Sequence, residues 1–298
     1  MDLTGTGLWS GELRYGDPAV AAESAAELDE LGYSAVWIPD VTGDVFTPIN
    51  NLLGGTKRIT VATGILNLWM TSAADTAKGY AETVAAHGRR LMLGIGVSHQ
   101  LLIDGAKAPG TYQKPLQVMT NYLDELDALP GQGVPPEDRM LAALGPKMLA
   151  LAAARTRGTH TYLVTPEHTA KVRAELGAGP LIAAEQGVVL ETDPERARDI
   201  ARQNLAGYLM LPNYTNNFLR LGFTEDDVAG GGSDRLIDAL IVWGDEDTIA
   251  ARVKAHHDAG AEHVCVQVLN PTGDGGGWGG SSLEQWRRLA PALLSGAA

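Results

Sequence analysis

Residues 90–99 read RLMLGIGVSH, an apolar run that contains two glycines and closes on a serine and a histidine. The run is continuously apolar rather than alternating, which is typical of a parallel strand covered on both faces. A helical segment that ends at Gly88 precedes it, and this alternation of helix and strand recurs along nearly the whole chain. The stretch therefore predicts one unit of a repeated α/β fold.

Eight apolar segments of this kind occur, nearly all separated by helices with clear boundary signals. Asp17 and Pro18, for example, begin a helix that Gly32 ends. Eight units predict an α/β fold of the (β/α)8 TIM-barrel type, as one domain over residues 1–298, and an open doubly wound sheet is the alternative. We expect a loose segment around Thr47 and Pro48, a helical insertion at roughly 205–238 before the last strand, and a last helix over 245–260. The expected strands are 5–10, 33–40, 58–66, 90–96, 139–144, 159–164, 181–190 and 263–269.

Composition excludes several classes of function. The net charge of −13 argues against a nucleic-acid or anionic-membrane surface, which needs clustered Lys and Arg. The single cysteine, Cys265, cannot form an internal disulfide and lies in the apolar run HVCVQVL, which predicts a buried thiol. No signal peptide or membrane-spanning stretch is visible, so we expect a cytoplasmic protein.

The chemistry of a (β/α)8 barrel lies in the loops that follow its strands. Asp40 ends the second strand, as either a local cap or a ligand contact, and His99 follows the fourth strand, where an imidazole can exchange a proton near neutral pH unless it is only a loop residue. Gly94 and Gly96 either relieve crowding in the barrel or leave room for a flat ligand. Gly64 interrupts the third strand, as either a bulge or a close approach of backbone to ligand.

The segment ALGPKML, residues 143–149, joins the fifth strand to a helix. Backbone N–H groups at the helix start, with Gly145 for close approach and Lys147 nearby, suit a phosphate, although Gly-Pro also occurs at such junctions without a ligand. The chain has no GxxxxGK[ST], GxGxxG, HExxH or GxSxG motif, and we expect no metal site. His256 and His257 lie within a helix beside charged neighbours, which predicts a solvated face.

Together these stretches resemble the bacterial luciferase-like family of flavin and deazaflavin oxidoreductases, and in particular its coenzyme F420-dependent branch. The resemblance runs through nearly the whole chain. It is carried by AAELDELGYSAVWIPD (25–40), RITVATGILN (58–67), RLMLGIGVSH (90–99), the pattern Y-x-K-P-x-x-x-M-x-x-Y-L (112–123), AALGPKMLALAA (142–153) and TYLVTPEHT (161–169).

The resemblance implies a barrel whose mouth holds the cofactor ring, with a non-prolyl cis peptide behind the ring at Gly64–Ile65 or Thr63–Gly64. It further implies that Asp40 contacts the ring or the substrate and that backbone amides near Gly145 hold the cofactor phosphate. Our own hypothesis is that His99 exchanges a proton with the substrate. By the same hypothesis, the glycines at 94 and 96 clear room beneath the ring. The expected catalytic residues are therefore His99 and Asp40, and the expected cofactor-binding residues are Asp40, Thr63, Gly64, Ile65, Gly96, Val97, Ser98, Leu144, Gly145, Pro146, Lys147 and Thr165.

The chain departs from the sugar-phosphate dehydrogenase branch of this family at two positions. That branch has a histidine next to the second-strand acid, where this chain has Val41, and a glutamate after the fourth strand, where this chain has His99. Both differences argue against that branch's substrate, whereas His99 keeps the capacity for proton transfer.

We therefore expect a deazaflavin (coenzyme F420)-dependent oxidoreductase that transfers a hydride between the cofactor and a small organic substrate. The alternatives are an FMN-dependent luciferase-like monooxygenase and a cofactor-binding barrel without catalysis; a Schiff-base lyase using Lys147 is disfavoured by its place after Gly-Pro. The family implies a homodimer, and we expect no nucleic-acid or membrane partner. Four further residues either shape the substrate pocket or only pack: Trp69, Met70, Tyr214 and Phe218.

Overall fold

The computed structural model describes residues 3–41, 43–129, 133–272 and 281–295. Eight parallel strands form a closed ring, because β1 pairs with both β2 and β10, and β10 pairs in turn with β8. The (β/α)8 barrel is thereby confirmed, and the open sheet is excluded. The ring consists of β1 (Gly5–Trp9), β2 (Ala35–Ile38), β3 (Thr60–Thr63), β5 (Leu91–Gly96), β6 (Arg139–Ala142), β7 (Gly158–Thr161), β8 (Leu181–Val189) and β10 (His263–Val268).

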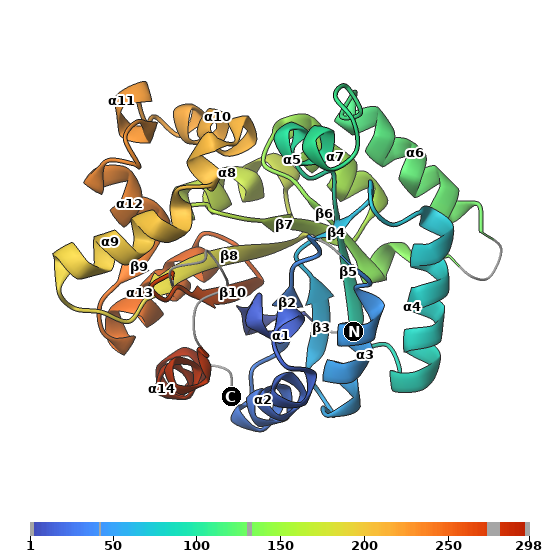
Figure 1. Cartoon of the computed structure of the whole chain (residues 1–298), viewed down its shortest axis with the longest axis horizontal. Helices are drawn as coiled ribbons and strands as arrows, with labels where there is room; N and C mark the ends of the chain where they lie inside the picture. The colour runs from blue at the N-terminus through green and yellow to red at the C-terminus, as the bar shows by residue number, and fades with distance from the viewer. Residues whose placement is uncertain (1–2, 42, 130–132, 273–280, 296–298) are drawn as a thin grey trace.

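Helices surround the strands on all sides (Figure 1). Their boundaries follow the local signals in the sequence: the Asp17 carboxylate accepts hydrogen bonds from the backbone N–H groups of Ala19 and Val20, and Gly32 has the left-handed φ of 99° that favours glycine. The helices outside the insertion are α1 (Glu12–Tyr15), α2 (Pro18–Leu31), α3 (Phe46–Gly54), α4 (Ala73–His87), α5 (Gln100–Ala106), α6 (Pro115–Asp127), α7 (Pro146–Arg155), α8 (Pro166–Leu176), α9 (Pro194–Leu205), α13 (Glu246–Asp258) and α14 (Leu283–Leu294). None of the described helices is long and apolar enough to cross a membrane.

Several elements were not expected from the sequence. The segment around Thr47 forms α3, whose buried residues Ile49, Leu52 and Leu53 have helical spacing. Two short strands also pair outside the ring: β4 (Leu66–Asn67) with β5, and β9 (Ile241–Trp243) with β8. The last helix is α14 rather than α13, and it packs beside α2, where the Tyr33 hydroxyl donates to the carbonyl of Trp286 at 2.8 Å.

The interior of the barrel is filled below its mouth by large side chains. Trp37 stacks on His160 with ring centroids 4.3 Å apart, and its Nε1 donates to His263 Nε2 at 2.9 Å. Cys265 is fully buried beside them, which confirms the expected buried thiol, and burial raises the pKa of this thiol. Any ligand must therefore lie at the mouth, above this layer of side chains.

The insertion is largely helical, as expected. It contains the 3₁₀ turn η2 (Tyr208–Met210), α10 (Pro212–Arg220), α11 (Glu225–Val228) and α12 (Asp234–Leu240). Phe218 and Leu236 belong to a hydrophobic cluster that also includes Val189 of β8 and residues of α9, so the insertion is packed onto the barrel. Figure 1 shows α10 on the same side of the barrel as α5 and α7, which follow strands β5 and β6.

The expectation that His256 lies on a solvated face is wrong. His256 is fully buried between α13 and the barrel, where its Nδ1 lies 2.9 Å from Thr169 Oγ1 and its Nε2 lies 3.0 Å from Gln186 Oε1. Burial lowers its pKa to about 3, so the ring is neutral. The charged neighbours in the sequence point away from this buried helix face.

Candidate functional site

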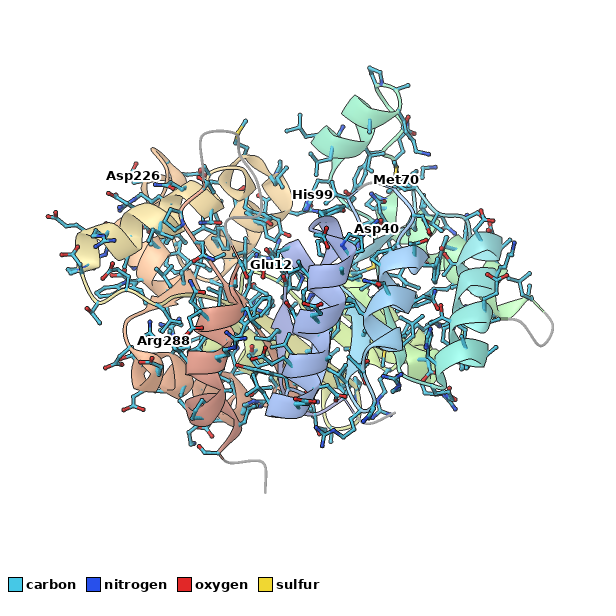
Figure 2. The ribbon with its side chains drawn as sticks, turned by 60° about the horizontal axis from the view of Figure 1, so that its bottom comes forward. Glu12, Asp40, Met70, His99, Asp226 and Arg288 are labelled. Carbon is cyan, nitrogen blue, oxygen red and sulfur yellow. The ribbon has the colours of Figure 1, made fainter. Side chains whose placement is uncertain are left out.

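The larger of two neighbouring cavities has a volume of about 660 Å³ and opens at the carboxyl ends of the strands. Its volume lies in the usual range for small-molecule sites, and its position is that of the active sites of (β/α)8 enzymes. Figure 2 shows Asp40, Met70 and His99 near one another at this end of the molecule. Nine residues predicted from the sequence line it: Asp40, Gly64, Ile65, Gly96, Val97, Ser98, His99, Leu144 and Gly145.

Four other predicted residues do not line the larger cavity. The buried hydroxyl of Thr63 donates to the carbonyl of Gly94 at 2.8 Å, and the hydroxyl of Thr165 accepts from the backbone N–H of His168 as the N-cap of α8. Pro146 occupies the first turn of α7, and the Lys147 side chain is exposed outside the cavity. Local structural roles account for the two threonines, and the position of the helix accounts for the other two residues.

The third strand is interrupted where the resemblance implied. The peptide bond between Gly64 and Ile65 is cis, and both residues line the larger cavity. A Cβ atom at Gly64 would lie only 2.5 Å from Nε1 of Trp9, so no larger residue fits the observed packing. The backbone at this position is therefore part of the cavity surface.

The two glycines of β5 serve different purposes. A Cβ at Gly94 would lie 2.1 Å from the carbonyl oxygen of Thr63, and Gly94 does not line the larger cavity. The expectation that Gly94 clears room beneath a ring is therefore wrong, because this glycine allows close packing of β3 on β5. Gly96 does line the cavity, and a Cβ there would lie 2.5 Å from the side chain of Ile65.

Asp40 is almost fully buried where β2 meets its loop. One carboxylate oxygen accepts from the backbone N–H of Asn67 at 3.2 Å, and the other lies 3.9 Å from the guanidinium of Arg14. Burial raises the pKa of Asp40, although the Asn67 bond and the Arg14 charge oppose this effect. The carboxyl group is thus held in one orientation at the cavity wall.

His99 is half-buried at the start of α5. Its Nδ1 lies 3.4 Å from Nδ2 of Asn213, and its ring packs 5.1 Å from the ring of Tyr214, both from the insertion. Burial lowers the pKa of His99 to about 4. The ring is therefore neutral near pH 7 and can accept a proton, but its pKa lies below the neutral range in which the sequence predicts proton exchange.

The first turn of α7, where the sequence predicts a phosphate site, begins at the edge of the larger cavity. Gly145 is its N-cap residue and makes no side-chain cap bond, so it leaves the helix start open to a ligand. Arg220, at the end of α10, lines the same cavity and is the one Lys or Arg among the described lining residues. Arg220 could not be predicted from the sequence, because the packing of the insertion, rather than a motif, places it there.

Three other lining residues were also missed. His160 Nδ1 donates to the carbonyl of Ala183 at 3.0 Å, whereas its buried Nε2 has no hydrogen-bond partner within the described parts of the chain. Tyr162 and Tyr208 line the cavity with their hydroxyls 3.0 Å apart. His160 and Tyr162 are two residues apart at the end of β7, and side chains with this spacing on a strand point to the same side. This spacing is a signal from which both residues could have been predicted.

Of the four residues left open as pocket or packing residues, Met70 and Tyr214 line the larger cavity, whereas Trp69 and Phe218 do not. The Trp69 indole donates to the carbonyl of Val97 at 2.8 Å, and Phe218 is fully buried within the insertion. No group of three His, Cys, Asp or Glu side chains in the described ranges is arranged to hold a metal ion.

Comparison with known proteins gives consistent results. The model of the luciferase-like monooxygenase family matches residues 3–263. The chain is 23% identical over 285 residues to the 5,10-methylenetetrahydromethanopterin reductase of Archaeoglobus fulgidus, an alignment that covers 79% of this chain and 85% of the relative.

Two solved structures share the fold. The coenzyme F420-dependent tetrahydromethanopterin reductase of Methanopyrus kandleri superposes with a TM-score of 0.75 at 16% identity, covering 99% of each chain. The oxygenating constituent of 3,6-diketocamphane monooxygenase of Pseudomonas putida, solved with FMN, superposes with a TM-score of 0.64 at 14% identity, covering 98% of each chain. At these identities the likeness concerns the fold.

Proposed function

Because the chain belongs to the luciferase-like monooxygenase family, and so is an enzyme, we propose that it is a coenzyme F420-dependent oxidoreductase acting on a small organic substrate. The observation that carries this proposal is the larger cavity. It brings together strand-end residues that are far apart in sequence, and nine of its lining residues are predicted from the sequence to contact the cofactor or to transfer a proton. The F420-dependent reductase from Methanopyrus kandleri, which covers 99% of this chain, supports the choice of a deazaflavin.

The cavity wall fits a planar ring that carries a phosphoryl group. The backbone around Gly64 and Ile65, together with Gly96, offers a surface with few projecting side chains. At the edge of the cavity, the open first turn of α7 and the guanidinium of Arg220 suit a phosphoryl group. When bound, the deazaflavin supplies the site that accepts or donates a hydride, and the protein supplies binding, orientation and charge.

His99 and Asp40 would assist the proton transfer that accompanies hydride transfer. Neutral His99, held beside Asn213 and Tyr214, would accept the proton of a substrate hydroxyl or, in the reverse direction, return it. Asp40, fixed by Asn67 and Arg14, would orient the ring or the substrate through a hydrogen bond. Both side chains line the same cavity, as a shared reaction requires.

An FMN-dependent monooxygenase is the second candidate function. The fold of the FMN-bound Pseudomonas putida protein supports it, and FMN also combines a flat ring with a phosphoryl group. The two candidates differ in their use of oxygen. No observation favours a barrel that binds cofactor without catalysis, and family membership argues against it.

Turnover measurements with both cofactors test the proposal. Purified protein is mixed with oxidised F420 and a panel of alcohols, and with reduced F420 and a panel of ketones and enones, while cofactor absorbance and dissolved oxygen are followed together. We expect the absorbance of F420 to change with at least one substrate and no oxygen to be consumed. Oxygen consumption with reduced FMN, combined with no turnover of F420, would favour the second candidate instead.

A further inference from the structure

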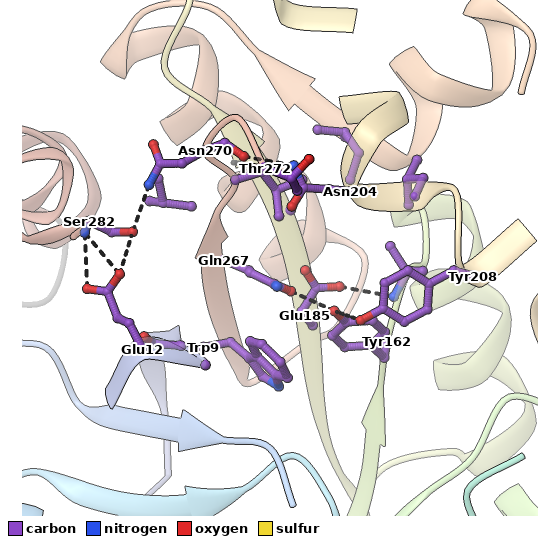
Figure 3. Close-up of a pocket in the computed structure, with 18 of the residues that line it drawn as sticks. Trp9, Glu12, Tyr162, Glu185, Asn204, Tyr208, Gln267, Asn270, Thr272 and Ser282 are labelled. Carbon is purple, nitrogen blue, oxygen red and sulfur yellow. Dashed lines mark hydrogen bonds between the residues drawn. The ribbon is translucent and has the colours of Figure 1, made fainter. Parts of the chain in front are cut away.

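A second, smaller cavity of about 360 Å³ lies beside the larger one, on the side of β1, β8 and β10 (Figure 3). Trp9, Tyr162 and Tyr208 line both cavities and so form the wall between them. This wall is fixed, because the Tyr162 hydroxyl donates to Gln267 Oε1 at 2.7 Å and lies 3.0 Å from the Tyr208 hydroxyl. The smaller cavity is thus a distinct compartment next to the proposed reaction site.

The smaller cavity contains a buried carboxyl group with an unsatisfied oxygen. Glu185, on β8, is 1% exposed. Its Oε2 accepts a hydrogen bond from the backbone N–H of Leu163 at 3.0 Å, whereas its Oε1 has no hydrogen-bond partner within the described parts of the chain. In Figure 3 one oxygen of Glu185 is bonded and the other points into the cavity. Because buried polar atoms are nearly always satisfied, this oxygen is available to bond a molecule in the cavity.

The described lining of the smaller cavity offers no positive charge to an anion. Glu12 and Glu185 both line it, and none of the described lining residues is a lysine, arginine or histidine. A phosphate or carboxylate group would therefore find no cation to pair with among these lining residues. Neutral amides make up much of the remaining polar lining: Gln203, Asn204, Gln267 and Asn270.

Glu185 is a hydrogen-bond donor at neutral pH. Burial raises its pKa to about 8, so the protonated acid predominates at pH 7. Because Oε2 accepts the Leu163 N–H, the acidic proton belongs on Oε1. The groups that interact electrostatically with Glu185 stay neutral here, since burial raises the pKa of each: Cys265, Tyr162, Tyr214 and, to about 12, Tyr208. Glu12, across the cavity, accepts hydrogen bonds from the Ser282 backbone N–H, and burial raises its pKa.

We propose that the smaller cavity binds an uncharged small molecule through a carbonyl oxygen, to which Oε1 of Glu185 donates a hydrogen bond, and that it rejects anionic analogues. Through the shared wall, this compartment would hold the polar end of the substrate and make Glu185 a specificity-determining residue. This last assignment rests on the proposed function, whereas occupancy of the cavity by a probe does not.

Benzamide and benzoate are suitable probes, because they have nearly the same shape and differ in charge. Cofactor-free protein is titrated with each by ligand-observed NMR. We expect benzamide to bind at least about tenfold more tightly than benzoate at neutral pH, and its affinity to fall about tenfold between about pH 6 and about pH 10 as Glu185 ionises. In Glu185→Gln the side-chain amide donates the same bond, so benzamide affinity is expected to be independent of pH. The exposed Glu175→Gln is the matched control and should behave as the wild type.

Equal affinity for the two probes, or benzamide binding to the wild type that does not change with pH, would overturn the proposal. So would a benzamide-soaked crystal in which the amide oxygen lies away from Glu185. Because no cofactor is present, failure of the probe alongside normal F420 turnover would overturn this inference only. Normal probe binding with neither F420 nor FMN turnover would overturn the proposed function only.

Discussion

Replacing Glu185 by glutamine is expected to stabilise the protein, and the gain should grow with pH. In the unfolded chain this glutamate ionises near its ordinary pKa of 4.5, whereas in the fold burial raises the pKa to about 8. Between pH 4.5 and about pH 8 the glutamate is ionised in the unfolded chain but still protonated in the fold. The stability that the protonated acid contributes is therefore fully present below pH 4.5 and is lost as pH rises to about 8. At about 1.4 kcal/mol per pKa unit, the full loss is about 5 kcal/mol, of which about 3 kcal/mol has been lost at pH 7.

The glutamine variant does not lose stability as pH rises, because the side chain carries no charge. It has nearly the same shape as glutamate and still accepts a hydrogen bond from the backbone N–H of Leu163. Urea unfolding of both proteins at about pH 5, 7 and 9 measures the difference in the free energy of unfolding. We expect the variant to exceed the wild type by less than about 1 kcal/mol at the lowest pH and by several kcal/mol at the highest. The exposed Glu175→Gln should show no such trend. A constant difference across the pH range would refute the reasoning, as would a variant that is less stable at pH 9.

Three further predictions concern the site. His99→Ala should lower kcat about 100-fold while changing the Kd of F420 less than about threefold. Steady-state kinetics and a binding titration measure the two quantities. A large rise in the Kd with little change in kcat would mean that His99 only binds the cofactor. Arg220→Ala should weaken F420 binding about tenfold in a fluorescence titration. Arg288 is exposed at the far end of the molecule, so Arg288→Ala should leave F420 binding unchanged. Equal effects of the two variants would mean that the net charge of the protein, and not a contact with Arg220, determines F420 binding. Gly94→Ala should reduce the free energy of unfolding by about 3 kcal/mol or more, because its Cβ would lie 2.1 Å from a backbone oxygen of β3. A Cβ at Gly145 would have no atom within 4 Å, so Gly145→Ala should change the free energy of unfolding little. Similar unfolding midpoints of the two variants in urea would contradict the packing argument.

The eight strands of the ring could be predicted because their signals are local. A continuous apolar run such as 90–96, preceded by a glycine that ends a helix, needs no knowledge of distant residues. β9 was missed because three residues, Ile241–Trp243, form too short a run to stand out beside the helix before them. α3 was missed because the proline at its third position suggested a loop, although the buried face of this helix has ordinary spacing.

The candidate site was predicted in part for the same reason. Residues at strand ends, such as Asp40 and His99, are brought together by the barrel itself, so the fold prediction was enough to place them. Arg220 could not be placed in this way, because it lies in the insertion and reaches the cavity only through tertiary packing. The low pKa of His99 was equally invisible, since it arises from burial and not from a neighbouring charge in the sequence.

A crystal structure of the protein soaked with coenzyme F420 tests the central claim most directly. We expect density for the ring in the larger cavity, against the backbone of Gly64 and Ile65, with the phosphoryl group between the first turn of α7 and the Arg220 guanidinium. A ring bound anywhere else would contradict it, as would a larger cavity that stays empty at F420 concentrations at which the enzyme turns over.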